Sequence, residues 1–216
     1  MPGSYTYTAD HPNVPVDYVC WGCAARFCNW LTSGNTETGS YALNGRTSNA
    51  DLLAVERAPG ARYVIPSEDE WFKAAYFDPE TGTYWEYATG NAVPDNVPPD
   101  GANYWVGSGV AWPMPLTDVG AYGESPSPWG TFDQSGNVFE WTEEVVYLYD
   151  QPYYLFRGGS WYCTNASYLD MEARGHRGSP DEEKSMVGLR LALVPEPATL
   201  ALLAVGALTA LGRRRR

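Results

Sequence analysis

The chain has 216 residues, of which 26 are acidic and 14 are basic, so its formal net charge is -12. This length suits one domain with at most a short appendage, and a hydrophobic content of 44% excludes wholesale disorder. The acidic balance argues against a nucleic-acid partner, because the surface would repel phosphate groups.

The first residues do not read as a targeting segment. Residues 1–18 are polar, with neither the basic start nor the apolar stretch of a signal peptide, so we expect a start placed too late or a fragment. Residues 19–33 are predicted to be a helix that ends at Gly34. The apolar residues that share one face of this helix are Trp21, Ala24, Ala25, Cys28 and Leu31.

The middle of the chain carries one strong local signal. Residues 34–60 read as loop and residues 62–65 as a short strand. Residues 67–70 read Ser-Glu-Asp-Glu, a capping box that predicts a helix over 68–77. Residues 78–130 are rich in Gly, Pro, Asn and Tyr, and we expect long ordered loops there.

The last third predicts strands over 138–141, 154–157 and 188–194. Two short helices among short strands and long aromatic loops indicate a compact α+β domain over residues 1–194.

The C-terminus differs in charge from this body. Residues 195–216 hold one acid and four arginines, a charge of +3, so residues 1–194 carry -15. An apolar run over 198–212 would span roughly 22 Å as a helix, which suits a short membrane anchor. The flanking residues are Pro195, Glu196 and Pro197 before the run, and Arg213, Arg214, Arg215 and Arg216 after it.

This order of Pro-Glu-Pro, apolar helix and arginine cluster resembles the PEP-CTERM sorting signal of Gram-negative bacteria. The resemblance implies export, a helix in the inner membrane before processing, cleavage by an exosortase-type peptidase and delivery to the cell envelope or surface. As an address, residues 195–216 are left out of the reasoning on the fold.

Several longer motifs resemble another family in the same order. They read Ala24-Ala-Arg-Phe-Cys-Asn-Trp-Leu31, Ile65-Pro-Ser-Glu-Asp-Glu-Trp-Phe-Lys-Ala-Ala75, Gly136-Asn-Val-Phe-Glu-Trp-Thr142, Phe156-Arg-Gly-Gly-Ser-Trp161 and Gly188-Leu-Arg190. Together they resemble the sulfatase-modifying-factor domain of formylglycine-generating enzymes, over about residues 14–194. The resemblance implies a variant of the C-type-lectin-like fold, and we expect the chain to lack the family's first strand-and-helix segment.

The resemblance also implies oxidase chemistry, in which two thiolates hold Cu(I). Cys163 matches the first thiolate and Ser160 the active-site serine, but no cysteine follows residue 163. Non-haem iron, used by some relatives, would need His11 and His176 together, and we interpret His176 as a surface residue. Copper is therefore a weakly supported cofactor.

The other cysteines allow alternatives. Cys20 and Cys23 form a CxxC that could bind zinc with Cys28 and Cys163, or form a disulfide. We favour a structural or disulfide role.

The resemblance further implies calcium in the loop around the Gly-Asn-Val-Phe-Glu motif, where hard oxygen donors suit this ion. The candidate ligands are Asp133, Glu140, the carbonyls of Gly136 and Val138, and Asn103 at a second site. Structural roles are favoured instead for Glu68, Glu70, Arg62 and Arg190, with Arg190 a buried salt-bridge partner.

The leading hypothesis is an exported, non-catalytic binding or scaffold domain with a carbohydrate, peptide or envelope ligand. Its aromatic loop residues would be Tyr84, Trp85, Tyr87, Tyr104, Trp105, Trp112 and Trp129. The alternatives are an oxygen-dependent oxidase with altered metal ligation, acting on a protein or a small thiol, and a purely structural envelope component.

Overall fold

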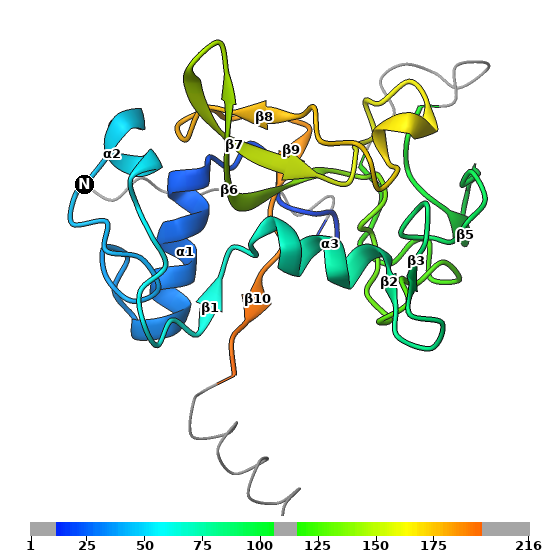
Figure 1. Ribbon diagram of the computed structural model, residues 1–216, viewed down its shortest axis with the longest axis horizontal. Helices are drawn as coiled ribbons and strands as arrows, with labels where there is room; N and C mark the ends of the chain where they lie inside the picture. Colours follow the sequence, from blue (N-terminus) through cyan, green and yellow to red (C-terminus); the bar gives the residue numbers. More distant parts are fainter. Residues whose placement is uncertain (1–11, 106–115, 196–216) are drawn as a thin grey trace, which may run out of the picture.

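The computed structural model describes residues 12–105 and 116–195. Figure 1 shows two helices at one end of the molecule and small hairpins at the other, with a third helix and a four-stranded sheet between them. The sheet has the order β8-β7-β6-β9. Its strands are β6 (Phe139–Leu148), β7 (Gln151–Arg157), β8 (Arg177–Gly178) and β9 (Val187–Gly188).

The first predicted helix is confirmed as α1 (Trp21–Ser33). It starts at Cys20, whose sulfur accepts a hydrogen bond from the third helical residue, and ends at Gly34, whose φ of 75° gives the left-handed C-terminal cap. Its apolar face packs into the main core, where the Trp21 ring stacks on Tyr154 of β7 at 4.0 Å between centroids. The packing of α1 therefore fixes one side of the sheet.

The capping box is also confirmed. In α3 (Glu68–Tyr76) the Ser67 hydroxyl accepts from the Glu70 N–H, and the Glu70 carboxylate accepts from the Ser67 N–H. The loop prediction for 34–60 missed α2 (Asn49–Leu53), which Ser48 caps. Both helices begin at serines, because a hydroxyl satisfies amide donors of the first turn.

The predicted strand over 188–194 is wrong in detail. The segment forms β9, parallel to β6, and then a separate strand β10 (Ala192–Leu193), antiparallel to β1 (Tyr63–Val64). Between β9 and β10, Arg190 pairs with Glu140 of β6 and donates to the Phe132 carbonyl. One apolar run thus serves two sheets.

The stretch predicted as loops contains two small hairpins. Their strands are β2 (Phe77–Asp78), β3 (Thr83–Tyr84), β4 (Asn96–Val97) and β5 (Asp100–Gly101). A 3-10 turn, η1 (Ala166–Tyr168), follows β7. Small sheets and few helices thus make up the predicted α+β domain.

None of the helices within the described ranges is long and apolar enough to cross a membrane. The apolar run over 198–212, expected to be a helix, lies outside the described residues.

Candidate functional site

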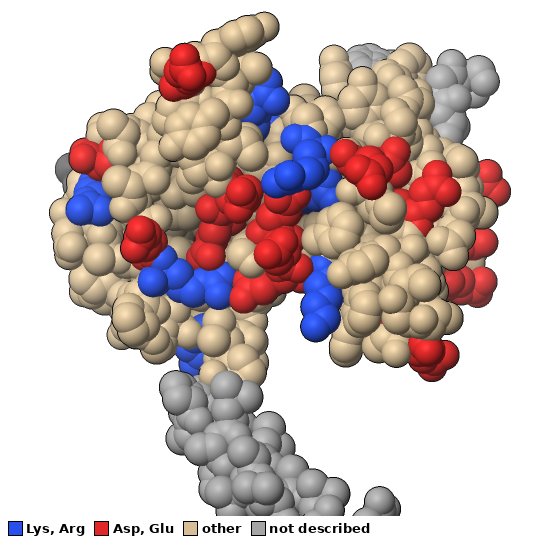
Figure 2. All heavy atoms as spheres, viewed as in Figure 1, with Lys and Arg blue, Asp and Glu red and all other residues tan. Residues whose placement is uncertain are grey.

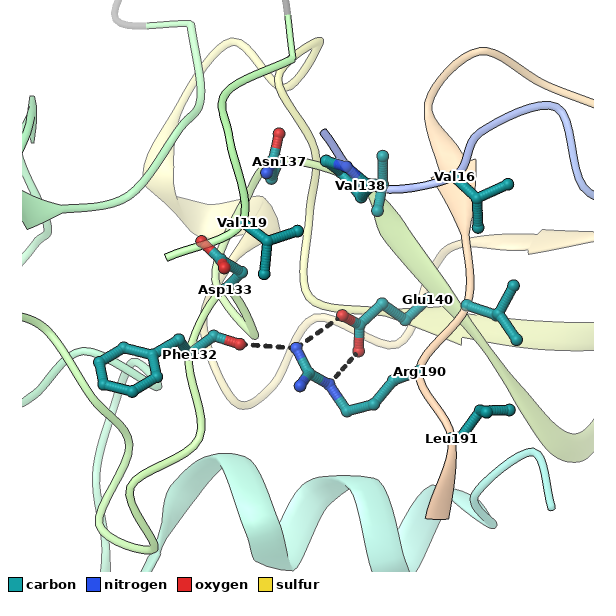
Figure 3. Close-up of a pocket in the computed structure, with 11 residues that line it drawn as sticks. Val16, Val119, Phe132, Asp133, Asn137, Val138, Glu140, Arg190 and Leu191 are labelled. Carbon is teal, nitrogen blue, oxygen red and sulfur yellow. Dashed lines mark hydrogen bonds and ion pairs between the residues drawn. The ribbon is translucent and has the colours of Figure 1, made fainter. Parts of the chain in front are cut away.

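The carboxylate of Glu140, on β6, is buried and forms an ion pair with Arg190. It accepts two hydrogen bonds of 2.9 Å from Arg190 and one of 2.6 Å from the Trp71 indole N–H. Arg190 also donates to the Phe132 carbonyl at 2.6 Å. Figure 3 shows the guanidinium and the carboxylate facing each other. Arg190 is therefore the salt-bridge partner that we predicted, although its side chain is 28% exposed rather than buried.

A pocket of about 410 Å³ opens beside this pair. Its walls include apolar side chains such as Val16, Val119 and Leu191, and the Asp133 carboxyl group lines it as well. Burial raises the pKa of Asp133, opposed by a hydrogen bond of 2.7 Å from the Gly120 N–H and by the charge of Arg190.

The geometry does not support the calcium prediction at Glu140. Three donors already occupy its carboxylate, so a cation would have to displace a guanidinium. Asp133 lines the same pocket, but its carboxylate accepts from a backbone N–H. Of the other two predicted ligand residues, Val138 also lines the pocket, whereas Gly136 is buried and is not among the lining residues.

Asn103 joins two chain segments. Its carbonyl accepts from the Asn137 N–H at 2.8 Å, and its side chain donates to the Asn137 side-chain oxygen at 3.3 Å. Gly136 has a φ of 81°, and a Cβ there would lie 2.4 Å from the Asn103 carbonyl oxygen. Close backbone approach therefore requires glycine at position 136, and the contacts of Asn103 are structural, while its role as a calcium ligand stays a prediction.

A second candidate site surrounds Cys163, directly after β7. The thiol is buried and accepts from the Ser160 N–H at 3.3 Å, with the Ser160 hydroxyl 3.6 Å from the sulfur. Burial raises the pKa of Cys163, and the contacts with Ser160 oppose the rise. Ser160 and Cys163, both singled out from the sequence, thus lie together, and burial disfavours the thiolate form of Cys163.

His176 is not the surface residue that we predicted. It is half-buried, and its ring lies 4.5 Å from Phe139 and 5.1 Å from Tyr168 between centroids. Burial lowers the pKa of His176, and the charges of Arg177 and Lys184 lower it further. Packing against aromatic rings therefore favours the neutral imidazole.

Two hollows of about 280 and 380 Å³ share Phe139, His176 and Met186 as lining residues. We call them together the His176 groove. Cys163 and Tyr168 line the smaller hollow. The larger one is lined by Tyr153, Arg177, Glu182 and Lys184, among others.

Sequence reasoning missed the groove residues from the segment 175–186. The only signal was a mixture of charged residues around His176 in an otherwise polar stretch.

The donor set beside Cys163 does not fit the two-thiolate copper site. Within the described ranges the free thiols are Cys163 and Cys28. Cys28 is buried on α1. The charged residues that affect its pKa, Glu143 and Arg57, do not line the groove. A histidine-rich iron site is equally incomplete there, because His176 is the one histidine that these ranges contain and His11 lies outside them.

The proposed zinc cluster of all four cysteines is wrong. The structure pairs Cys20 with Cys23 as a disulfide, in agreement with the alternative that we favoured. Cys28 and Cys163 are each buried elsewhere as free thiols.

The acidic residues of α3 have structural roles, as expected. Glu68 is buried and accepts from Arg174 at 2.7 Å. The Arg57 guanidinium holds the pKa of Glu70 below its usual range, through hydrogen bonds of 2.7 and 2.9 Å. Figure 2 shows acidic and basic side chains mixed in a band across this face. Arg62 is exposed.

The predicted aromatic face is not continuous. Tyr87 and Tyr104 are buried in the core, whereas Tyr84 and Trp129 are about half exposed. Trp112 lies outside the described residues. Loop aromatics therefore divide between core packing and a small exposed set.

Two family models match the chain. The sulfatase-modifying factor enzyme 1-like domain matches residues 3–194, and the PEP-CTERM protein-sorting motif matches residues 193–216. The chain therefore belongs to the sulfatase-modifying factor family. The sorting motif supports export to the cell envelope and processing by exosortase.

Hercynine oxygenase of Mycobacterium tuberculosis is 34% identical over 154 residues, covering 61% of this chain and 34% of that protein. The chain thus spans about a third of the length of this curated relative. Among solved structures, CarF aligns with a TM-score of 0.65 and 25% identity, over 87% of this chain and 71% of CarF. Variable protein 1 of Treponema denticola aligns at 0.62 and 23%, over 88% and 76%, and supports the fold.

Proposed function

We propose that this domain is an exported binding module of the cell envelope, and that it holds an acidic carbohydrate in the His176 groove. The observation that carries this proposal is the pair of adjoining hollows around His176, lined by both aromatic rings and cations. Concave sites with apolar walls and a few convergent polar groups are typical of ligand pockets.

The lining residues suit a ring with a carboxylate. Tyr153 and Tyr168 offer flat faces, and Arg177 lies 5.9 Å above the Tyr153 ring. Lys184 pairs with Glu182 at 2.9 Å, an arrangement in which a ligand carboxylate can share the ammonium. Charge-assisted hydrogen bonds to such cations supply orientation, while ring stacking supplies contact area.

A non-catalytic role is consistent with the chemistry beside Cys163. Thiols act as nucleophiles when deprotonated, and burial raises the pKa of Cys163. The second thiolate of the family's copper site has no counterpart after residue 163.

A titration with an oligogalacturonate and with a neutral oligosaccharide of equal length tests the proposal. We expect binding of the acidic ligand alone, weakened by salt and by Lys184→Met at least tenfold, roughly the value of one charge-assisted hydrogen bond. Trp129→Ala is the control, because Trp129 does not line the groove and should leave the affinity unchanged. Equal binding of the neutral ligand, or no binding of the acidic one, would contradict the proposal.

One observation favours an oxidase as the second candidate. Cys163, His176 and Met186 line the same hollow, and they offer a thiol, an imidazole and a thioether. Such soft donors suit Cu(I), so this set would replace the two thiolates of the family's copper site. A Cu(I) titration decides: stoichiometric tight binding that Cys163→Ala abolishes would replace the non-catalytic proposal.

A further inference from the structure

Cys20 and Cys23 lie at the start of α1 and are not part of the His176 groove. Cys20 is the N-cap residue, and its sulfur accepts from the Cys23 N–H at 3.1 Å. Cys20 is buried, whereas Cys23 is exposed to solvent. The first-turn amides of a helix favour negative charge, so they stabilise thiolates at this position once the pair is reduced.

A segment 160 residues away brings a third donor to this helix end. The Tyr18 N–H donates to the Lys184 carbonyl at 3.0 Å, and the Gly22 N–H donates to the Pro180 carbonyl at 3.2 Å. Tyr18 precedes Cys20 and Gly22 lies between the two cysteines, so these two backbone hydrogen bonds hold the segment 180–184 against the start of α1. Glu183 lies between them.

The donor atoms of Cys20, Cys23 and Glu183 all lie within 4.8 Å of one another. Within residues 12–105 and 116–195, no other group of three or more His, Cys, Asp or Glu side chains meets this distance. Tetrahedral Zn²⁺ takes Cys sulfur at about 2.3 Å and carboxylate oxygen at about 2.0–2.2 Å, so its ligand atoms lie within such a separation.

We propose that the reduced protein binds a divalent cation of the Zn²⁺ class through Cys20, Cys23 and Glu183. Two thiolates and one carboxylate occupy three tetrahedral positions, and water takes the fourth on the exposed side of Cys23. This site is independent of the ligand proposed for the groove.

Redox state gates the site, because the disulfide has no thiolate to offer. A thiol reductant attacks one sulfur as its thiolate and forms a mixed disulfide. A second reductant thiolate then attacks the reductant sulfur of this mixed disulfide, so that the second cysteine leaves as a thiolate and the two reductant molecules leave as a small-molecule disulfide. The two electrons reach the protein as two cysteine thiols, and the cation binds with loss of their protons. In an oxidising compartment the disulfide closes the site.

The test measures Zn²⁺ binding by the full chain in competition with a chromophoric chelator, after a phosphine reductant or without it. We expect one equivalent in the reduced protein and none in the disulfide form. Cys23→Ser should abolish binding. Glu183→Gln should weaken it at least about tenfold, the smallest loss typical of even an outer-sphere partner.

Two matched variants serve as controls. Asp181→Asn removes an exposed carboxylate from the same segment, and Cys28→Ala removes a free thiol from the same helix. Both should retain the wild-type affinity. The proposal is overturned if the reduced protein takes up no zinc, if Cys23→Ser binds as the wild type does, or if Glu183→Gln matches Asp181→Asn.

Discussion

Glu140 was predicted to bind calcium and Cys163 was a weakly supported copper ligand, and in the structure the two residues line different pockets. At Glu140 the negative charge is cancelled inside the protein, by Arg190 and by the Trp71 indole. At Cys163 a single buried thiol with a raised pKa lines a hollow of about 280 Å³. The comparison teaches that one family motif can serve an internal ion pair, at Glu140, while another lines a hollow, at Cys163.

The largest effect is expected from breaking the first region. Arg190→Ala leaves the Glu140 carboxylate buried without its cation, which should cost about 3–5 kcal/mol in the free energy of unfolding. Urea denaturation measures it. Arg62→Ala removes an exposed arginine and should cost less than about 1 kcal/mol. Similar losses in both variants would mean that Glu140 does not depend on its partner.

A glycine between the two regions should show the next largest effect. Gly159 has a φ of 77°, and a Cβ there would lie 2.6 Å from a Leu169 side-chain carbon. Gly159→Ala combines backbone strain with overpacking, for a loss of about 2–4 kcal/mol.

Gly60→Ala is the matched control for this change. Gly60 has a φ of 80° and open space around it, so the variant should cost only about 1–2 kcal/mol of backbone strain. Equal costs for the two variants, by urea denaturation, would show that the contact with Leu169 relaxes freely.

The groove should make stability depend on pH through His176. Its pKa is lowered in the folded protein, so the unfolded chain binds the proton more readily. Stability is fully present above the ordinary pKa of about 6.5 and is lost as pH falls below it. We expect His176→Phe to flatten this part of the curve. Parallel curves for both proteins, from unfolding between pH 7.5 and 5, would contradict the assignment.

The smallest effect sharpens the calcium question. Burial raises the pKa of Asp133, so folding disfavours its charged form, and the backbone of Asp133 has a φ of 60°. Asp133→Asn keeps an acceptor for the Gly120 N–H, and asparagine tolerates positive φ. We therefore expect slight stabilisation, with no effect of a chelator on the melting of either protein. Destabilisation that appears only when calcium is present would support the calcium site.

Local signals predicted the elements whose causes are local. The capping box at Ser67 and the terminating Gly34 placed two helices nearly to the residue, since both satisfy the ends of their own helix. The strand over 188–194 failed, because its pairing with β6 and β1 comes from segments far away in the chain.

The sites followed the same division. The Gly-Gly-Ser motif correctly joined Ser160 to Cys163, three residues apart. Nothing local marks His176 as a neighbour of Phe139, or Glu183 as a neighbour of Cys23, because each contact depends on the path of the chain from β7 to β9.

The pairing of β10 with β1 also affects how the sorting motif is presented. The Val194 N–H donates to the Arg62 carbonyl, so the body is fastened to the residue directly before Pro195. In an unfolded chain a long flexible segment would precede the motif, whereas in the folded protein the preceding residues are fixed in β10. A processing enzyme that binds several extended residues before its cleavage point would therefore require the β1–β10 pairing to break first.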